Sequence, residues 1–122
     1  MTSSEKLNQI RDVDIDPSGK FKYILIKVTD PETKEEKYIV RGYKSCAYHI
    51  NIFESVEPSI TKLKCKAKCV GGGRILHKPE VKSIFIYGYS QGFGRADHAI
   101  AEKLIKEKYS DYTDISWSNE GY

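Results

Sequence analysis

A run of nine residues, FKYILIKVT at positions 21–29, limits what this chain can fold into more than any other feature. Its β-branched and aromatic side chains are those enriched in strands, so we predict a strand there. Similar runs predict further strands at residues 38–43, 61–70, 74–77, 81–87 and 112–117. A chain of 122 residues with this many strands has the length of one domain built around a sheet.

Two segments depart from the strand pattern and predict helices. Apolar residues recur at helical spacing over residues 45–57 and again over residues 95–109. We expect Ser45 to cap the first helix and Pro58 to end it. Because the strands are not strictly alternated with helices, the fold class is expected to be α+β: a single-domain mixed β-sheet of about six strands with two helices.

Polar or glycine-rich segments mark the expected boundaries. We interpret residues 1–11 as a flexible N-terminal leader and residues 12–122 as the folded domain. Gly71–Gly73 is expected to break the strand before it, and residues 78–80 are expected to form a turn. Residues 89–94 (YSQGFG) predict a loop between a strand and the second helix.

Composition and charge indicate a cytoplasmic protein. The 20 Lys and Arg against 17 Asp and Glu give a net charge of +3, whereas a nucleic-acid surface needs a stronger basic stripe. The lysine-rich residues 62–68 alternate like a strand with a solvated face. No apolar run approaches the ~20 residues that span a bilayer. The N-terminus lacks a secretory apolar core, and three cysteines do not make a disulfide framework.

Familiar site motifs fail on spacing. Residues 12–16 (DVDID) resemble the start of a calcium loop, but Pro17 stands where that loop requires glycine. Cys69 and Arg74 are one residue closer than in the Cys-x5-Arg loop of cysteine phosphatases, which disfavours that chemistry. Cys65 and Cys69 would lie ~13 Å apart along a strand, too far for a disulfide. Zinc-ligand spacings are absent too, so we predict no metal and no cofactor.

Two features remain as candidates for chemistry. Residues 84–96 run from strand to small-residue loop to helix, a junction whose backbone N–H groups favour an anion, and Ser90 adds a hydroxyl. The second feature is the three histidines, His49, His77 and His98, since imidazole transfers protons near neutral pH. The glycine-rich turn and the buried core histidine are the plain structural alternatives. Spacing alone does not choose among the three histidines.

The joint order and spacing of several short runs resembles the Janus/Ocnus family, whose enzymatic members are small protein phosphohistidine phosphatases. No single run is specific, but together they extend from residue 12 to the end of the chain. The runs are Val13–Asp16, Gly19–Tyr23, Ile39–Lys44, Tyr48–His49, Gly71–Ile75, Tyr87–Ser90, His98–Ile100 and Gly121–Tyr122.

The resemblance implies a one-domain mixed sheet with two helices and a metal-independent phosphatase acting on phosphohistidine-containing proteins. By position, the family's catalytic histidine corresponds to His49 and its substrate-contacting lysine to Lys22. Its phosphate-binding loop corresponds to Ser90-Gln91-Gly92, and Arg74 is matched as a further phosphate-binding residue. His98 matches a family histidine to which we assign no catalytic role.

On this reading, His49 acts as a general base toward water or as a transient nucleophile. We expect a monomer that binds neither nucleic acid nor membrane. The alternative is a non-catalytic module that uses the same pocket to bind phosphate or phosphoproteins. Release of inorganic phosphate from phosphohistidine separates the two functions.

Overall fold

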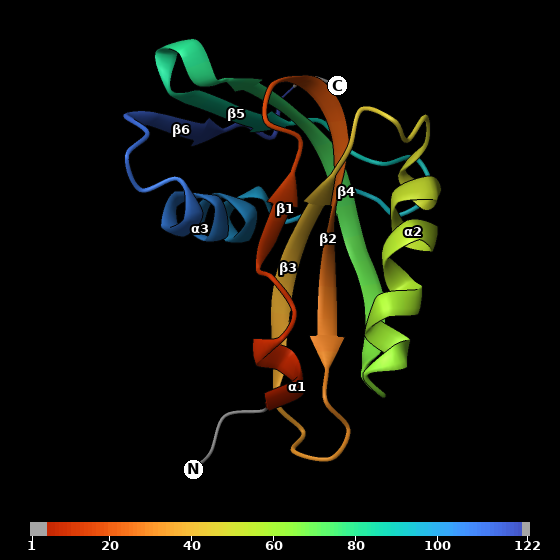
Figure 1. Ribbon diagram of the computed structural model, residues 1–122. Helices are drawn as coiled ribbons and strands as arrows, with labels where there is room; N and C mark the ends of the chain where they lie inside the picture. Colours follow the sequence, from red (N-terminus) through yellow and green to blue (C-terminus); the bar gives the residue numbers. More distant parts are fainter. Residues whose placement is uncertain (1–4, 121–122) are drawn as a thin grey trace.

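The computed structural model describes residues 5–120 and contains one six-stranded mixed sheet with helices on both sides (Figure 1). The strand order is β1-β3-β2-β4-β5-β6. The outer strands β1 and β6 pair in parallel with their neighbours, and the inner pairs are antiparallel. The strands are β1 Val13–Ile15, β2 Gly19–Thr29, β3 Glu36–Gly42, β4 Lys66–Lys78, β5 Ser83–Tyr87 and β6 Asp114–Trp117. The helices are α1 Glu5–Asn8, α2 His49–Lys62, α3 His98–Lys108 and the short 3-10 helix η1 Pro79–Val81.

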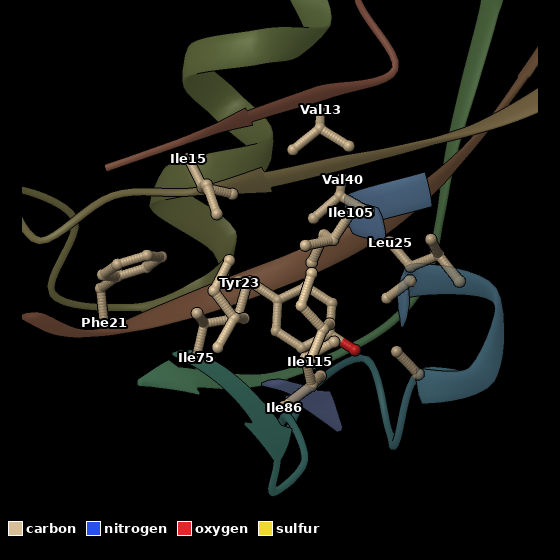
Figure 2. Close-up of a cluster of buried hydrophobic side chains, with 13 residues drawn as sticks. Val13, Ile15, Phe21, Tyr23, Leu25, Val40, Ile75, Ile86, Ile105 and Ile115 are labelled. Carbon is tan, nitrogen blue, oxygen red and sulfur yellow. The ribbon is translucent and has the colours of Figure 1, made fainter. Parts of the chain in front are cut away.

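The alternation of side chains along β2 divides the core into two clusters. Tyr23 and Leu25 belong to a cluster that includes Ala101 and Ile105 of α3, and Figure 2 shows this side of the sheet. Ile24 and Ile26 point the other way, because successive strand residues face opposite sides. They pack with Ile52, Val56 and Ile60 of α2. We call the two sides of the sheet the α3 face and the α2 face. The predicted α+β class with six strands is confirmed.

The predicted bounds of the first long helix were wrong at both ends. Helix α2 begins at His49 and is preceded by Tyr48, not capped by Ser45. Pro58 lies inside the helix, which continues to Lys62. A proline removes one hydrogen bond from a helix interior. The next turn forms nevertheless, since it carries Ile60, which is 1% exposed, onto the sheet.

The glycine triplet does not break a strand as predicted. Strand β4 runs from Lys66 through Gly71–Gly73 to Lys78. The first residues of the strand predicted over residues 61–70 are instead the end of α2, at residues 61–62, and a turn, at residues 63–64. The pairing of β4 with β2 shifts by one residue between Leu25 and Ile26. Gly71, at φ 146°, lies beside that shift, and a side chain there would meet the backbone of Ala96 at 2.6 Å. The triplet therefore permits a bulge and close contacts within one strand.

Residues 5–11, which we expected to form part of a flexible leader, include helix α1. Leu7 and Ile10 are 5% and 8% exposed and pack into the α2-face cluster. Residues 1–4 and the Gly121–Tyr122 match lie outside the described residues.

Helix α3 starts later than predicted, at His98, because the side chain of Asp97 caps it by accepting from the Ala99 amide. Between residues 5 and 120, no helix has both the length and the apolar character to cross a membrane.

Candidate active site

A pocket of about 510 Å³ opens on the α2 face, at the N-terminal end of α2. It brings together the predicted site residues, although they come from four separate segments of the chain. These residues are Lys22, His49, Arg74, Ser90, Gln91 and Gly92. Sequence reasoning missed four further lining residues, Tyr48, Ile50, Tyr89 and Phe93.

Two cations form the floor of the pocket. Lys22 of β2 and Arg74 of β4 are direct partners in the antiparallel register, so their side chains leave the sheet on the same face. Lys22 continues the row of Ile24 and Ile26 beyond the part of the sheet that α2 covers. Like charges placed directly opposite each other destabilise a sheet. Their pairing at a pocket is therefore typical of a site that binds an anion.

The position of His49 is set by the start of α2 and by the glycines of β4. It is the first residue of the helix, and the amide of Tyr48 before it donates to Asn51 Oδ1 over 3.0 Å. The His49 ring lies against Gly72, where an added Cβ would come within 2.8 Å of the ring carbon Cδ2. Only a residue without a side chain allows the imidazole to lie this close to the strand.

One ring nitrogen of His49 is bonded and the other is available. The Nε2–H group donates to the carbonyl oxygen of Gly73 over 2.9 Å, since a carbonyl can only accept. In the neutral ring, Nδ1 is then unprotonated and has no hydrogen-bond partner among residues 5–120. The described part of the chain has no fully buried side-chain nitrogen that lacks a partner, so Nδ1 reaches solvent.

The surroundings of His49 favour its neutral form. Burial lowers the pKa of His49 below its usual value of 6.5, and the charges of Lys22 and Arg74 lower it further. The hydrogen bond to Gly73 acts in the opposite direction, because it stabilises the protonated ring. The lowered pKa leaves Nδ1 ready to accept a proton at neutral pH.

The other two histidines are structural. His77 donates from Nδ1 to the Asp16 carbonyl at 2.9 Å and accepts at Nε2 from the Tyr112 hydroxyl at 2.6 Å. His98 donates from Nε2 to the Gly88 carbonyl at 2.9 Å and accepts at Nδ1 from the Tyr23 hydroxyl. Both rings are 2% exposed or less. His77 and His98 thus have partners on both ring nitrogens, whereas His49 has one, among residues 5–120, on Nε2 alone. Sequence spacing could not make this distinction.

The loop after β5 offers fewer free hydrogen-bond donors for an anion than its sequence suggested. Ser90 and Gly94 form a tight bridge in which each amide donates to the other's carbonyl, so the Ser90 N–H is already used. The Ser90 hydroxyl oxygen accepts from the Phe93 amide at 3.1 Å and keeps its own hydrogen to donate. The amides of Gln91 and Gly92 have no partner among the described residues. They and the Ser90 hydroxyl are the donors that remain.

Phe93 fixes this loop to the start of α2. Its ring packs against Phe53 of the helix with centroids 6.1 Å apart, and it belongs to the edge of the α2-face cluster. The contact joins segments that are forty residues apart in sequence, so no local pattern predicted it. An aromatic residue within a glycine-containing loop was the one available signal.

Cys69 does not have the properties of a nucleophile. Burial raises the pKa of its thiol to about 11, and its Sγ donates to the Gly71 carbonyl at 3.5 Å. A reactive cysteine needs a lowered pKa. No cluster of three or more His, Cys, Asp or Glu side chains suited to a metal ion occurs within residues 5–120.

Comparisons with known proteins identify the family of the chain. The model of the Janus/Ocnus family matches residues 7–113. The 14 kDa phosphohistidine phosphatase of Sus scrofa is 46% identical over 127 residues, with 100% of each chain covered. The Homo sapiens protein of the same name is 47% identical over 118 residues, covering 93% of this chain and 94% of the relative. The sex-regulated protein janus-A of Drosophila melanogaster is 48% identical over 120 residues, covering 98% and 87%. The chain belongs to the Janus/Ocnus family.

Proposed function

We propose that this protein is a hydrolase that removes the phosphoryl group from phosphohistidine in proteins. The observation that carries the proposal is the unprotonated Nδ1 of His49, which reaches solvent in a pocket whose floor holds Lys22 and Arg74. The relatives from Sus scrofa and Homo sapiens are named for this activity and align with nearly the whole chain. An anion site stabilises the charge that develops in phosphoryl hydrolysis and a neutral base activates the attacking water, and the pocket combines the two.

The phosphoryl group binds between the sheet and the loop. Lys22 and Arg74 offset its negative charge from the floor of the pocket. The amides of Gln91 and Gly92 and the Ser90 hydroxyl donate to its oxygens from the opposite side. The transition state of phosphoryl transfer spreads charge over these oxygens, so donors fixed in place lower the barrier.

His49 activates the attacking group. Nδ1 takes a proton from a water molecule while the water oxygen forms a bond to phosphorus. The P–N bond breaks, and its electron pair stays on the substrate imidazole nitrogen. That nitrogen takes up a proton from solvent, and protonated His49 releases one to solvent, which returns it to its neutral form. The products are inorganic phosphate and the unmodified histidine. Positioned general bases contribute roughly 10²–10⁴-fold to such rates.

A covalent route uses the same nitrogen. In that route Nδ1 attacks phosphorus directly, the substrate histidine leaves, and water then hydrolyses a phosphohistidine at position 49. Rapid quenching of a reaction with ³²P-labelled substrate distinguishes the two. Acid-labile, base-stable label on His49 within one turnover supports the covalent route, and its absence during turnover supports the general base.

The activity is tested by measuring phosphate release from phosphohistidine and from phosphoramidate. We expect His49→Ala to lose most turnover while its thermal unfolding stays cooperative. Glu54→Ala, at an exposed position on the same helix, is the matched control and should retain full activity. If wild type binds the phosphorylated substrate but releases no phosphate, the protein is a phosphate-binding module instead.

We further propose that the reaction needs no metal and that the protein acts as a cytoplasmic monomer. Turnover should continue in excess EDTA, and its loss would contradict metal independence. Sedimentation should give the mass of one chain. Binding to DNA or RNA should be absent at physiological salt.

A further inference from the structure

The α2 face continues beyond the pocket as a surface whose side chains belong to neither core cluster. On β4 and β5, Arg74 pairs with Tyr87, and two residues farther along Leu76 pairs with Phe85. These side chains lie on the same face as Lys22, because Lys22 pairs with Arg74. Leu76, Phe85 and Tyr87 are each only partly buried and belong to neither core cluster. We call these three residues the sheet platform.

The platform is ordered although it is partly exposed. The rings of Phe85 and Tyr87 stack with centroids 5.3 Å apart and planes 17° from parallel. Leu76 lies beside Phe85 on the neighbouring strand, which makes one continuous apolar surface. Side chains held on central strands of a sheet are rigid, so ordering them on contact with a partner costs little.

The platform adjoins the phosphate pocket through the sheet itself. Tyr87 is the direct neighbour of Arg74, which lines the pocket. Leu76 lies two residues from Arg74 along β4, about 7 Å away at the usual rise of a strand. A polypeptide whose phosphohistidine occupies the pocket therefore has its adjacent residues within reach of the platform.

The charges beside the platform define the partner further. Lys20 is exposed and is the direct cross-strand partner of Leu76, at the end of the platform away from Arg74. Lys22 and Arg74 supply positive charge at the pocket end. The surface thus combines an apolar centre with cations at both ends. A partner that matches it carries an apolar side chain near the phosphoryl group and an acidic group beyond it.

We propose that the sheet platform binds the polypeptide segment next to the phosphohistidine of a protein substrate. This inference rests on the proposed function, since it assigns the substrate class of the same pocket. Contacts with the platform contribute to the binding of phosphohistidine proteins and peptides. They do not contribute to the binding of small phosphoramidates, which do not extend beyond the pocket. The platform is thereby the part of the site that makes the protein selective for polypeptides.

The test compares two substrates on variants of the platform. Leu76→Thr and Phe85→Thr remove apolar surface but keep a residue suited to a strand. We expect each to lower kcat/KM about tenfold on a peptide with leucine on both sides of phosphohistidine, as the loss of one buried apolar contact does. Phosphoramidate turnover should stay within about twofold of wild type. Val81→Thr, at an apolar position that is 60% exposed in η1, is the control and should change neither.

Three results overturn the inference: unchanged peptide turnover, an equal loss on both substrates, or a wild type that treats leucine-flanked and serine-flanked peptides alike. A change of oligomeric state in Leu76→Thr with unchanged turnover would assign the platform to a second copy of the chain. Binding of the leucine-flanked peptide with a phosphonate in place of the phosphoryl group is measured by fluorescence polarisation. This binding measurement tests the platform even if wild type releases no phosphate. Absence of phosphate release would contradict the proposed hydrolase activity but not the role of the platform.

Discussion

His49 and Gly73 are joined by a hydrogen bond of 2.9 Å from the imidazole Nε2 to the backbone carbonyl oxygen. The bond determines which nitrogen carries the proton and thus which one faces the pocket. A backbone carbonyl in the middle of a paired strand does not move as a side chain does, so the ring orientation is fixed by the sheet.

Replacing Lys22 with methionine should weaken substrate binding and shift the pH profile. The loss of one charge-assisted contact to the phosphoryl group should raise KM about tenfold or more. Lys22 is one of the charges that lower the pKa of His49, so its removal should raise that pKa. At low pH kcat/KM falls because the base becomes protonated, and this fall should then occur at higher pH. Lys27→Met, at the other end of β2, is the control; a fall at unchanged pH in Lys22→Met would argue against His49 as the base.

Gly72→Ala should damage both the fold and the site. The new Cβ would come within 2.8 Å of His49 Cδ2 and of the Tyr23 carbonyl oxygen, and the latter is backbone. We expect a loss of about 1–3 kcal/mol in the free energy of unfolding, together with reduced turnover. Gly92→Ala is the matched control for stability, because nothing lies within 4 Å of the added atom. Equal thermal midpoints for the two variants would contradict the close packing of His49.

Ser90→Ala should loosen the loop of residues 89–94 and also remove a hydrogen-bond donor from the pocket. The hydroxyl oxygen accepts from the Phe93 amide, so the variant leaves that amide without its partner. We expect a higher KM and faster hydrogen exchange at the Phe93 amide. Faster exchange with an unchanged KM would show that Ser90 shapes the loop but does not contact the substrate.

Tyr23→Phe should lower stability without affecting catalysis. The Tyr23 hydroxyl donates to His98 Nδ1 on the α3 face, and both residues are fully buried. Leaving that nitrogen unpaired should cost about 1–3 kcal/mol of unfolding free energy, measured by urea denaturation. The kcat of the folded variant should match wild type, and a large drop would mean that the Tyr23–His98 pair affects the reaction, either directly or through Gly73.

Pro58→Ala should stabilise the protein. Pro58 is exposed inside α2, where a proline is less favourable than alanine by about 3 kcal/mol in an ideal helix. We expect a gain of about 1–3 kcal/mol by chemical denaturation. Glu54→Ala, at another exposed position of α2, should stay within about 0.5 kcal/mol of wild type. A destabilised Pro58→Ala would show that the proline relieves strain that alanine does not.

The sheet was predictable where local pattern and burial agree. The apolar residues of this run, Ile24, Leu25, Ile26 and Val28, are each 1% exposed or less, so the strand preference of the run and its environment favour the same structure. Local rules failed where tertiary contacts override them. Pro58 normally ends a helix, but burial of Ile60 extends this one. Gly71–Gly73 normally breaks a strand, but here the missing side chains admit His49 and His98.

The residues of the pocket were predictable only in part. Resemblance selected His49, because helical spacing could not distinguish it from a core histidine. The deciding fact, an imidazole nitrogen without a partner, exists only in three dimensions. No local pattern placed Tyr48 at the pocket, since a rim residue is defined by what lies across the pocket from it. Phe93 had only one signal, its position as an aromatic residue in a glycine-containing loop.

Gly73 contacts a histidine on each side of the sheet. Its carbonyl oxygen accepts from His49, and its Cα is so close to His98 that an added Cβ would lie 2.7 Å from the ring carbon Cε1. The rings of His49 and His98 therefore lie on opposite sides of one residue of the strand. A small displacement of α3 would reach the pocket without crossing any flexible segment. Substitutions on the α3 face that shift Gly73 are therefore expected to change the position of the His49 ring, although they lie outside the pocket.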